Sequence, residues 1–319
     1  MRAIQIVKPR TLAMLDDAPK PVPLDGEVLV RCHYVALCGS NMGQYTGEGL
    51  WADGFPNPIA WAGHENIGTI VESRCKGWEP GTLVLAQPEG YFGFAEFIRA
   101  KPPGLAALPA DAPDVAALIV AQPLATVLRA MDMAGGVINQ RCAVVGQGPM
   151  GLIFTHLLGR LGARQVIAAD VLPWRLEWAK RFGATEVIDA SKDKVIEKVK
   201  DLTHGEMVDF CVEAVGQPDT LSTAAHLPKP FGRLFVFGMP HYKVQPFPWY
   251  DVFRNSLTIF ACVGPDCAAY FQAATDMVVQ GRVDLGAMVT PRMPWASAPE
   301  AFEMYAERAT GSLKLTLVL

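Results

Sequence analysis

The chain has two parts that differ in their pattern of apolar and polar positions. In the first hundred residues, short runs rich in valine, isoleucine, leucine and aromatic residues alternate with clusters of glycine, proline, asparagine and aspartate. Such runs are typical of β-strands separated by turns. Strands are predicted at 27–37, 66–73, 82–86 and 94–100. This part is therefore expected to form an all-β barrel or sandwich.

From about residue 113, apolar strands alternate with stretches of helical period. The predicted strands are 142–146, 165–170, 208–214, 233–238 and 257–263. The predicted helices are 150–162, 173–183, 192–202 and 217–227. This alternation favours an α/β lobe, in which a doubly wound parallel sheet carries helices on both faces.

The last part of the chain returns to the first lobe. Two helical stretches, 267–280 and 298–309, precede a final β run at 313–319, and together they are too small for a separate domain. With 319 residues, the chain exceeds the roughly 250–300 at which one core stops growing. We expect one domain from 1–113 and 265–319, and a second from 114–264.

Composition narrows the function classes. Half of the residues are hydrophobic and 19 % are charged, which suits a buried core. The longest apolar run, 115–121, is far shorter than the roughly 18 residues of a membrane span, and the first ten residues resemble no secretory leader. Seven cysteines without CxxC pairs favour a reducing compartment. A cytoplasmic protein is expected.

Charge gives no sign of a polyanionic partner. The net charge is −4, and no lysine- or arginine-rich run is present. The basic footprint of nucleic-acid or anionic-lipid binding is therefore missing. We expect no nucleic acid and no membrane as a partner, and instead a small molecule.

The clearest local motif lies between a predicted strand and a predicted helix. Gly146, Gly148 and Gly151 have the GxGxxG spacing of a dinucleotide site, with Pro149 and Met150 between the last two. The glycines permit a tight turn, close approach of the pyrophosphate and packing of helix on strand. A Walker loop is excluded because no GK[ST] follows.

The next predicted strand ends on Asp170, about 20 residues after the motif, where a carboxylate meets the adenosine ribose. A carboxylate there repels a 2′-phosphate, so NAD is favoured over NADP. Arg175 is either a residue that stacks beside the adenosine or a solvated helix residue.

Two short sequences in the β lobe contain metal-binding side chains. Cys38 follows a predicted strand, and His64 with Glu65 precedes another. Thiolate and imidazole are good zinc ligands, and a catalytic zinc keeps one position open. Taken alone, they are only a candidate pair, because a free cysteine is usually a small buried apolar residue and a lone histidine is usually an ordinary core or surface residue.

The order of these motifs resembles the medium-chain dehydrogenase/reductase superfamily. CGSN at 38–41, GHE at 63–65, GFAEF at 93–97, the GxGPxG loop and VEAVG at 212–216 follow one another as in its zinc-dependent alcohol and polyol dehydrogenases. The resemblance covers essentially the whole chain. It implies a GroES-like β-barrel catalytic domain, a Rossmann domain, substrate in the cleft, and subunits that join their sheets into a homodimer or homotetramer.

Site roles follow from the resemblance position by position. Cys38 and His64 correspond to catalytic zinc ligands, and Glu65 to a carboxylate that ligates the zinc or lies beside it. Ser40 corresponds to the hydroxyl that relays the alcohol proton. Lys314 lies near the family's basic residue, which reaches the pyrophosphate or the surroundings of the metal ligands.

Several positions depart from the family pattern. Gln122 replaces the glutamate of a Glu-Pro-Leu sequence that supplies a third ligand, and Asn41 replaces an aspartate. Gly43 stands where many members carry a relay histidine. The segment 83–100 lacks the cysteines of a structural zinc, so at most one zinc, the catalytic one, is expected.

Residues around the nicotinamide and the substrate are less sharply indicated. Gly238 and the segment 262–264 correspond to positions that line the nicotinamide in the family. Five aromatic residues suggest an aromatic-lined pocket, or serve as ordinary loop anchors: Tyr45, Trp51, Trp61, Tyr91 and Phe92.

The leading hypothesis is an NAD-dependent, zinc-assisted oxidoreductase that interconverts a secondary alcohol, such as a polyol or sugar derivative, and its ketone. Two alternatives remain at this point. One is a zinc-free reductase of the quinone or enoyl type with the same fold, and the other is a non-catalytic binding protein. Zinc content and an NADH-versus-NADPH titration discriminate among them.

Overall fold

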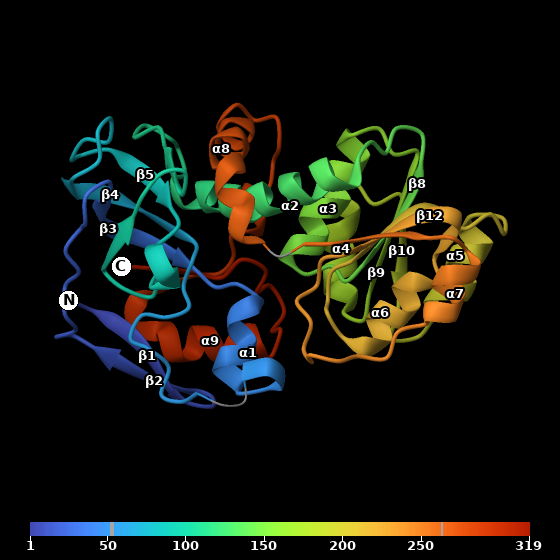
Figure 1. Ribbon diagram of the computed structural model, residues 1–319, viewed down its shortest axis with the longest axis horizontal. Coiled ribbons are helices and arrows are strands. Elements are labelled where there is room, and N and C mark those ends of the chain that lie inside the picture. The colour runs from blue at the N-terminus through green and yellow to red at the C-terminus, as the bar shows by residue number, and fades with distance from the viewer. Residues whose placement is uncertain (52–53, 263) are drawn as a thin grey trace. The chain divides into compact units, whose positions relative to one another are not determined.

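The chain folds into two compact units, shown in the computed structural model of Figure 1, which describes residues 1–51, 54–262 and 264–319. Unit 1 comprises Met1–Thr126 and Pro265–Leu319, and unit 2 comprises Val127–Gly264. The first boundary thus falls after Thr126 and not after residue 113. The short 3-10 helix η3 (Ala116–Val120) contacts two strands of unit 1, which explains the later boundary.

Unit 1 contains two sheets. Its strands are β1 (Ala3–Lys8), β2 (Thr11–Leu15), β3 (Val28–Ala36), β4 (Asn66–Ser73), β5 (Leu83–Ala86), β6 (Phe97–Ala100), β7 (Leu105–Ala107), β14 (Arg292–Pro294) and β15 (Thr316–Val318). β1 and β2 form an antiparallel pair, and seven strands form the larger sheet. β3 is central, because it pairs with β4 on one side and with β6 and β15 on the other.

Helices complete unit 1. They are α1 (Ser40–Thr46), α8 (Phe271–Val279) and α9 (Ala298–Ala306). In α9, the buried residues Ala298, Ala301, Phe302 and Tyr305 recur with the spacing of one helix face. The Phe302 ring packs 5.2 Å from the ring of Tyr45, which ties α9 to α1.

Unit 2 is a six-stranded parallel sheet covered by helices on both faces (Figure 1). Its strands are β8 (Arg141–Val145), β9 (Gln165–Asp170), β10 (Glu186–Asp189), β11 (Val208–Glu213), β12 (Pro228–Val236) and β13 (Thr258–Ala261). The helices are α3 (Pro149–Arg160), α4 (Pro173–Arg181), α5 (Val195–Leu202), α6 (Pro218–Ala225) and α7 (Trp249–Arg254). The expected doubly wound Rossmann sheet is confirmed.

The strand order identifies the ligand-binding end of this sheet. The order is β10-β9-β8-β11-β12-β13, which in chain order reads 3-2-1-4-5-6. The order reverses between β8 and β11, and ligands of such sheets bind outside the carboxyl ends of the strands at that point. Both the GxGxxG loop after β8 and the residues after β11 lie at this end.

Some elements differ from the sequence-based expectation. The β1–β2 pair and β10 were not predicted. β12 begins at Pro228, five residues before the predicted strand, because a register shift against β11 accommodates the Pro-Lys-Pro segment. In the final run only Thr316–Val318 is a strand, whereas Lys314 turns its side chain into the interior.

One helical stretch, 116–134, is long and apolar enough to span a bilayer by length and composition alone. It consists of η3 and α2 (Ala121–Ala134). Of its most apolar window, 67 % is buried inside the structure, as in the core helix of a globular protein.

Candidate active site

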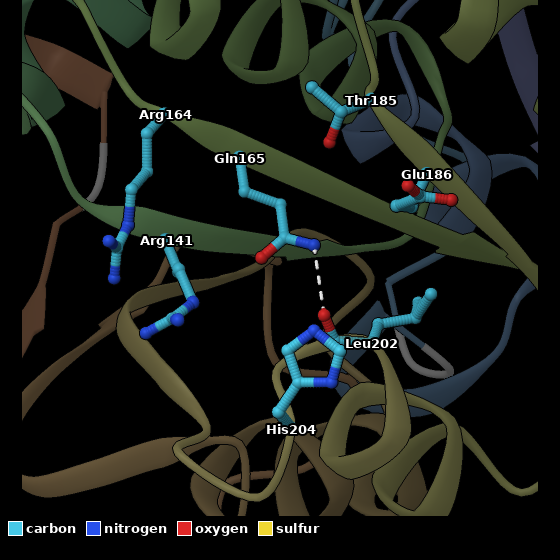
Figure 2. Close-up of a pocket in the computed structure, with 7 residues that line it drawn as sticks. All are labelled: Arg141, Arg164, Gln165, Thr185, Glu186, Leu202 and His204. Carbon is cyan, nitrogen blue, oxygen red and sulfur yellow. Dashed lines mark hydrogen bonds between the residues drawn. The ribbon is translucent and has the colours of Figure 1, made fainter.

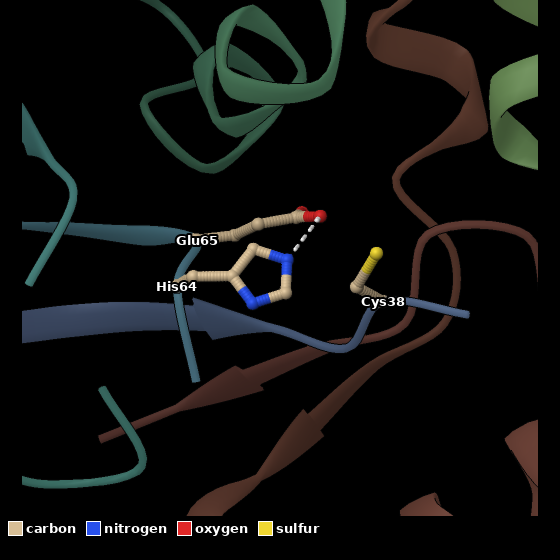
Figure 3. A group of neighbouring side chains, drawn as sticks. All are labelled: Cys38, His64 and Glu65. Carbon is tan, nitrogen blue, oxygen red and sulfur yellow. Dashed lines mark ion pairs between the residues drawn. The ribbon is translucent and has the colours of Figure 1, made fainter. Parts of the chain in front are cut away.

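Cys38, His64 and Glu65 meet at one corner of the unit 1 sheet. β3 and β4 are antiparallel neighbours, and Val35 near the end of β3 pairs with Asn66 at the start of β4. Residues just beyond that pair must therefore lie close together. The ligand atoms of the three side chains all lie within 4.8 Å of one another, and Figure 3 shows the side chains converging.

Asn41 and a shared carbonyl hold this corner in place. The Asn41 side chain accepts the Cys38 N–H at 2.9 Å and donates to the Ala62 carbonyl at 2.9 Å. The same carbonyl lies 3.0 Å from His64 Nδ1. This contact assigns the proton to Nδ1 and turns Nε2 toward Glu65, 4.0 Å away (Figure 3). Asn41 thus fixes the Cys38 backbone relative to the Ala62 carbonyl.

The thiol and the imidazole perturb each other. Burial alone would raise the pKa of the Cys38 thiol, but the hydrogen bond and charge of His64 lower it. Burial likewise opposes the charged imidazole, yet Cys38 and Glu65 raise the pKa of His64. Opposite pKa shifts of this kind favour a thiolate, which is the form of cysteine that binds metals.

Glu65 is tied to the end of the chain. It is fully buried, and both of its carboxylate oxygens accept from Lys314 Nζ, at 2.8 and 2.9 Å. Lys314 is also buried, and Glu65 raises its pKa against the opposing effect of burial. Lys314 therefore reaches the carboxylate beside the cluster, one of the two destinations that the resemblance implied.

The donor set fits a zinc ion. A thiolate and an imidazole are preferred zinc ligands, and the close approach of the three ligand atoms leaves room for one ion to reach them. Glu65 carries the third donor, with its charge balanced by Lys314. Gln122 is buried in the first turn of α2, and its expected role at the open side of the metal stays a prediction.

Of the other residues expected near the metal ligands, some lie beside the candidate site and one lies in the hydrophobic core. Ser40 begins α1, two residues after Cys38, and is half-buried. The Tyr91 ring lies edge-on to the His64 ring at 6.0 Å, as an aromatic pocket residue would. Tyr45, by contrast, is buried, and its hydroxyl donates to Glu303, so the expectation that it lines the pocket is wrong. The side chain of Trp51 lies outside the described residues.

The dinucleotide motif has the geometry its sequence predicts. Gly146 has φ +94°, and a Cβ on Gly151 would lie 1.8 Å from the Gly146 carbonyl oxygen, so neither position tolerates a side chain. Gly148 precedes α3, whose first residue is Pro149 and second is Met150. The N–H groups at the start of α3 are thus available to a pyrophosphate.

Asp170 touches the same loop. Its Oδ2 accepts the Gln147 N–H at 2.6 Å, and its Oδ1 accepts the Leu172 N–H at 2.9 Å. Arg175 Nη1 lies 3.9 Å from Asp170, and the arginine side chain is only 14 % exposed. The solvated alternative for Arg175 is therefore wrong, because the residue packs beside the carboxylate.

Sequence reasoning missed a role for Glu213, the last residue of β11. It is buried, and its backbone carbonyl accepts the N–H of Gly238, one of the expected nicotinamide positions. An acidic residue at the end of an apolar strand was the available signal. Of the other nicotinamide positions, Cys262 follows β13, and Val263 lies outside the described residues.

A polar pocket in unit 2 lies away from this end. Figure 2 shows it at the starts of β8, β9 and β10, beside the end of α5. Its lining residues are Arg141, Arg164, Gln165, Thr185, Glu186, Leu202 and His204. Because dinucleotides bind at the carboxyl ends of such strands, this pocket is not the cofactor site.

Comparison with family models gives the same division of the chain. The alcohol dehydrogenase GroES-like domain matches residues 24–109, and the zinc-binding dehydrogenase model matches residues 149–280. The two matches fall on the sheet of unit 1 and mainly on unit 2, respectively. The expected GroES-like and Rossmann folds are confirmed.

Individual proteins are similar along their whole length. L-threonine 3-dehydrogenase of Bacillus velezensis is 25 % identical over 335 residues, covering 95 % of both chains. The enzyme of the same name from Pyrococcus horikoshii is 26 % identical over 347 residues, covering 99 % of both. The solved structure of an alcohol dehydrogenase from Thermus sp. ATN1 superposes with a TM-score of 0.86 at 25 % identity, covering 100 % of this chain and 99 % of that one.

Proposed function

Because the chain belongs to the zinc-dependent alcohol dehydrogenases of the medium-chain dehydrogenase/reductase superfamily, we propose that it oxidises a secondary alcohol to a ketone with NAD and one zinc ion. Its class, an alcohol-ketone oxidoreductase that uses a nicotinamide cofactor, follows from the family. The single observation that carries the finer proposal is the convergence of Cys38, His64 and Glu65 at the end of β3.

Cys38 and His64 would hold the zinc, with Glu65 as the third donor. When bound, zinc supplies a Lewis acid that lowers the pKa of the alcohol hydroxyl. Asn41 binds both the Cys38 N–H and the Ala62 carbonyl that contacts His64, and so holds Cys38 and His64 in place relative to each other. Lys314 neutralises the negative charge of Glu65. These contacts pre-organise the ligands before metal or substrate arrives.

Ser40 is proposed to accept the proton of the alcohol hydroxyl. It follows Cys38 closely and lies in the first turn of α1, so the rigid corner that holds the thiolate also positions its hydroxyl. Gly43 offers no further relay group, so the proton leaves through cofactor hydroxyls or water. Tyr91 packs edge-on against the His64 ring and would line the site on that side.

NAD is the proposed cofactor. The N–H groups at the start of α3 would bind its pyrophosphate, in the loop formed by Gly146, Gly148, Pro149, Met150 and Gly151, of which Pro149 has no N–H to donate. Asp170 would accept from the adenosine ribose hydroxyls, and Arg175 would pack beside the adenosine. Gly238, two residues after the end of β12, would contact the nicotinamide.

The proposed substrates are small secondary alcohols with further polar groups, such as polyols or sugar derivatives. Two relatives, one bacterial and one archaeal, are named for L-threonine. L-threonine is itself a secondary alcohol with neighbouring polar groups. This similarity supports the secondary-alcohol class and leaves the individual substrate to the assay below.

A substrate panel with a cysteine variant tests this function. The zinc-loaded protein should reduce NAD, followed at 340 nm, with secondary polyols or L-threonine in the panel. Cys38→Ser should lose zinc and at least about 100-fold of this activity, because one of three ligands is removed. NADH binding should be unchanged, because the nucleotide residues lie in the other unit.

Gln122→Glu completes that series. It should tighten zinc binding if the side chain faces the metal, because a carboxylate is a better ligand than an amide. Elemental analysis gives the zinc content of each variant. A wild type that binds no zinc, together with a fully active Cys38→Ser protein, would support the zinc-free quinone or enoyl reductase instead.

Cofactor choice is tested at Asp170. Asp170→Asn keeps an acceptor for the Gln147 N–H and removes the negative charge, which leaves Arg175 able to attract a 2′-phosphate. The NADPH-to-NADH affinity ratio should rise by about 10-fold or more, from the loss of like-charge repulsion. Fluorescence titration measures both affinities. A wild type that already prefers NADPH contradicts this role of Asp170.

We also propose that subunits associate through β13, as a homodimer or a homotetramer. β13 ends the sheet order, and among the described strands it pairs only with β12. Large apolar side chains are exposed in the segments that flank it: Phe231, Val244, Trp249, Tyr250 and Phe253. An open edge with apolar surroundings is stable when a second copy pairs with it.

Light scattering at micromolar concentration tests the assembly. The wild type should exceed the monomer mass of 34.5 kDa. Phe253→Glu should shift it toward the monomer, because a charge then replaces an exposed apolar contact. The matched control is Val279→Glu, at an exposed apolar position of unit 1, which should leave the mass unchanged. A monomeric wild type rejects the proposal.

A further inference from the structure

Glu213 is a fully buried acidic residue at the cofactor end of unit 2. It ends β11, the strand beside the point where the sheet order reverses. In the register, Glu213 pairs with Val145 of β8 on one side and with Val236 of β12 on the other. Glu213 therefore lies where three neighbouring strands of the sheet, β8, β11 and β12, end. Among the described residues, no basic side chain forms an ion pair with its carboxylate.

One oxygen of its carboxyl group holds the turn that follows β11. Oε1 accepts the N–H groups of Val215 and Gly216, each at 2.9 Å, and the hydroxyl of Thr220 at 2.8 Å. The second oxygen, Oε2, is buried with no hydrogen-bond partner among the described residues. A single acceptor oxygen thus fixes the turn and the start of α6.

The backbone of Glu213 holds the loop after β12. Its carbonyl oxygen accepts the N–H groups of Phe237 and Gly238, both at 2.9 Å. The two loops are in van der Waals contact, since a Cβ on Gly216 would lie 1.9 Å from the Met239 carbonyl oxygen. A displacement of the turn after β11 must therefore move the loop that carries Gly238.

The same turn supports the GxGxxG loop. A Cβ on Gly146 would lie 2.4 Å from Cγ2 of Val215, so the Val215 side chain packs directly on the first glycine of the motif. The position of Val215 is set by its hydrogen bond to Glu213. Glu213 thus connects the loops after β8, β11 and β12.

We propose that Glu213 is a positioning residue for the nicotinamide cofactor, which acts by fixing the Val215–Gly216 turn against Gly146 and Gly238. The role depends on one acceptor oxygen and on the shape of the side chain. It rests on the proposed function, because it assumes that a dinucleotide binds at these loops.

Isosteric variants test the role. Glu213→Gln keeps an acceptor oxygen for the three donors, whereas Glu213→Met keeps only the approximate size. The NADH dissociation constant is measured by fluorescence titration, with the melting temperature of each variant in parallel. Glu213→Gln should bind NADH within about 3-fold of wild type, and Glu213→Met should bind about 10-fold or more weakly, because three donors lose their acceptor.

A control at the other end of the same strand separates positioning from general destabilisation. Asp209 accepts the Arg141 N–H and pairs with Lys229. Asp209→Leu should lower the melting temperature and leave the NADH dissociation constant unchanged. The kcat of Glu213→Met at saturating cofactor should stay closer to wild type than its KM for NAD does.

Two results would overturn the inference. The first is Glu213→Met binding NADH as wild type does, and the second is Glu213→Gln losing as much affinity as Glu213→Met, which would assign the effect to charge. A wild type that binds no nicotinamide cofactor overturns the proposed function as well. Failure of the function and failure of the inference alone are therefore distinguishable.

Discussion

The buried ion pair between Glu65 and Lys314 is the constraint on which the candidate metal site depends. The two residues are 249 positions apart, and neither has more than 1 % of its side chain exposed. Removing one partner of such a pair costs about 3–5 kcal/mol, because the other charge stays buried. Lys314 Nζ also lies 3.3 Å from the Leu37 carbonyl, so the C-terminal segment is locked to the turn that carries Cys38.

Buried carboxylates organise the cofactor end of unit 2 in a related way. Asp170 accepts an N–H from the GxGxxG loop, and Glu213 accepts two from the turn after β11. Backbone donors, and not only lysine or arginine, thus bind these acids. Loops at the ends of parallel strands have no ladder partners of their own, so acceptors at the strand ends determine where the loops lie. These hydrogen bonds thus fix the loops at the proposed cofactor site.

The sequence predicted what depends on local pattern. The central strands follow from alternation, and the GxGxxG loop follows from its glycines. Spacing alone made Cys38 and His64 only a candidate pair, and their shared site came from the family resemblance. Contacts between distant residues were not predictable in this way, as the hydrogen bond from the Gly238 N–H to the Glu213 carbonyl and the Asn41 bridge to Ala62 show. The β1–β2 pair was missed because its alternation is short, and Tyr45 was misplaced because its partners, Phe302 and Glu303, are remote in the chain.

We propose that one zinc ion binds at the corner formed by Cys38, His64 and Glu65. X-ray absorption at the zinc K-edge, on protein loaded with one equivalent of zinc, tests it most directly. We expect one sulfur ligand at about 2.3 Å, with the remaining nitrogen and oxygen ligands at about 2.0–2.2 Å. A first shell without sulfur, or a zinc ion removed by simple desalting, would contradict it.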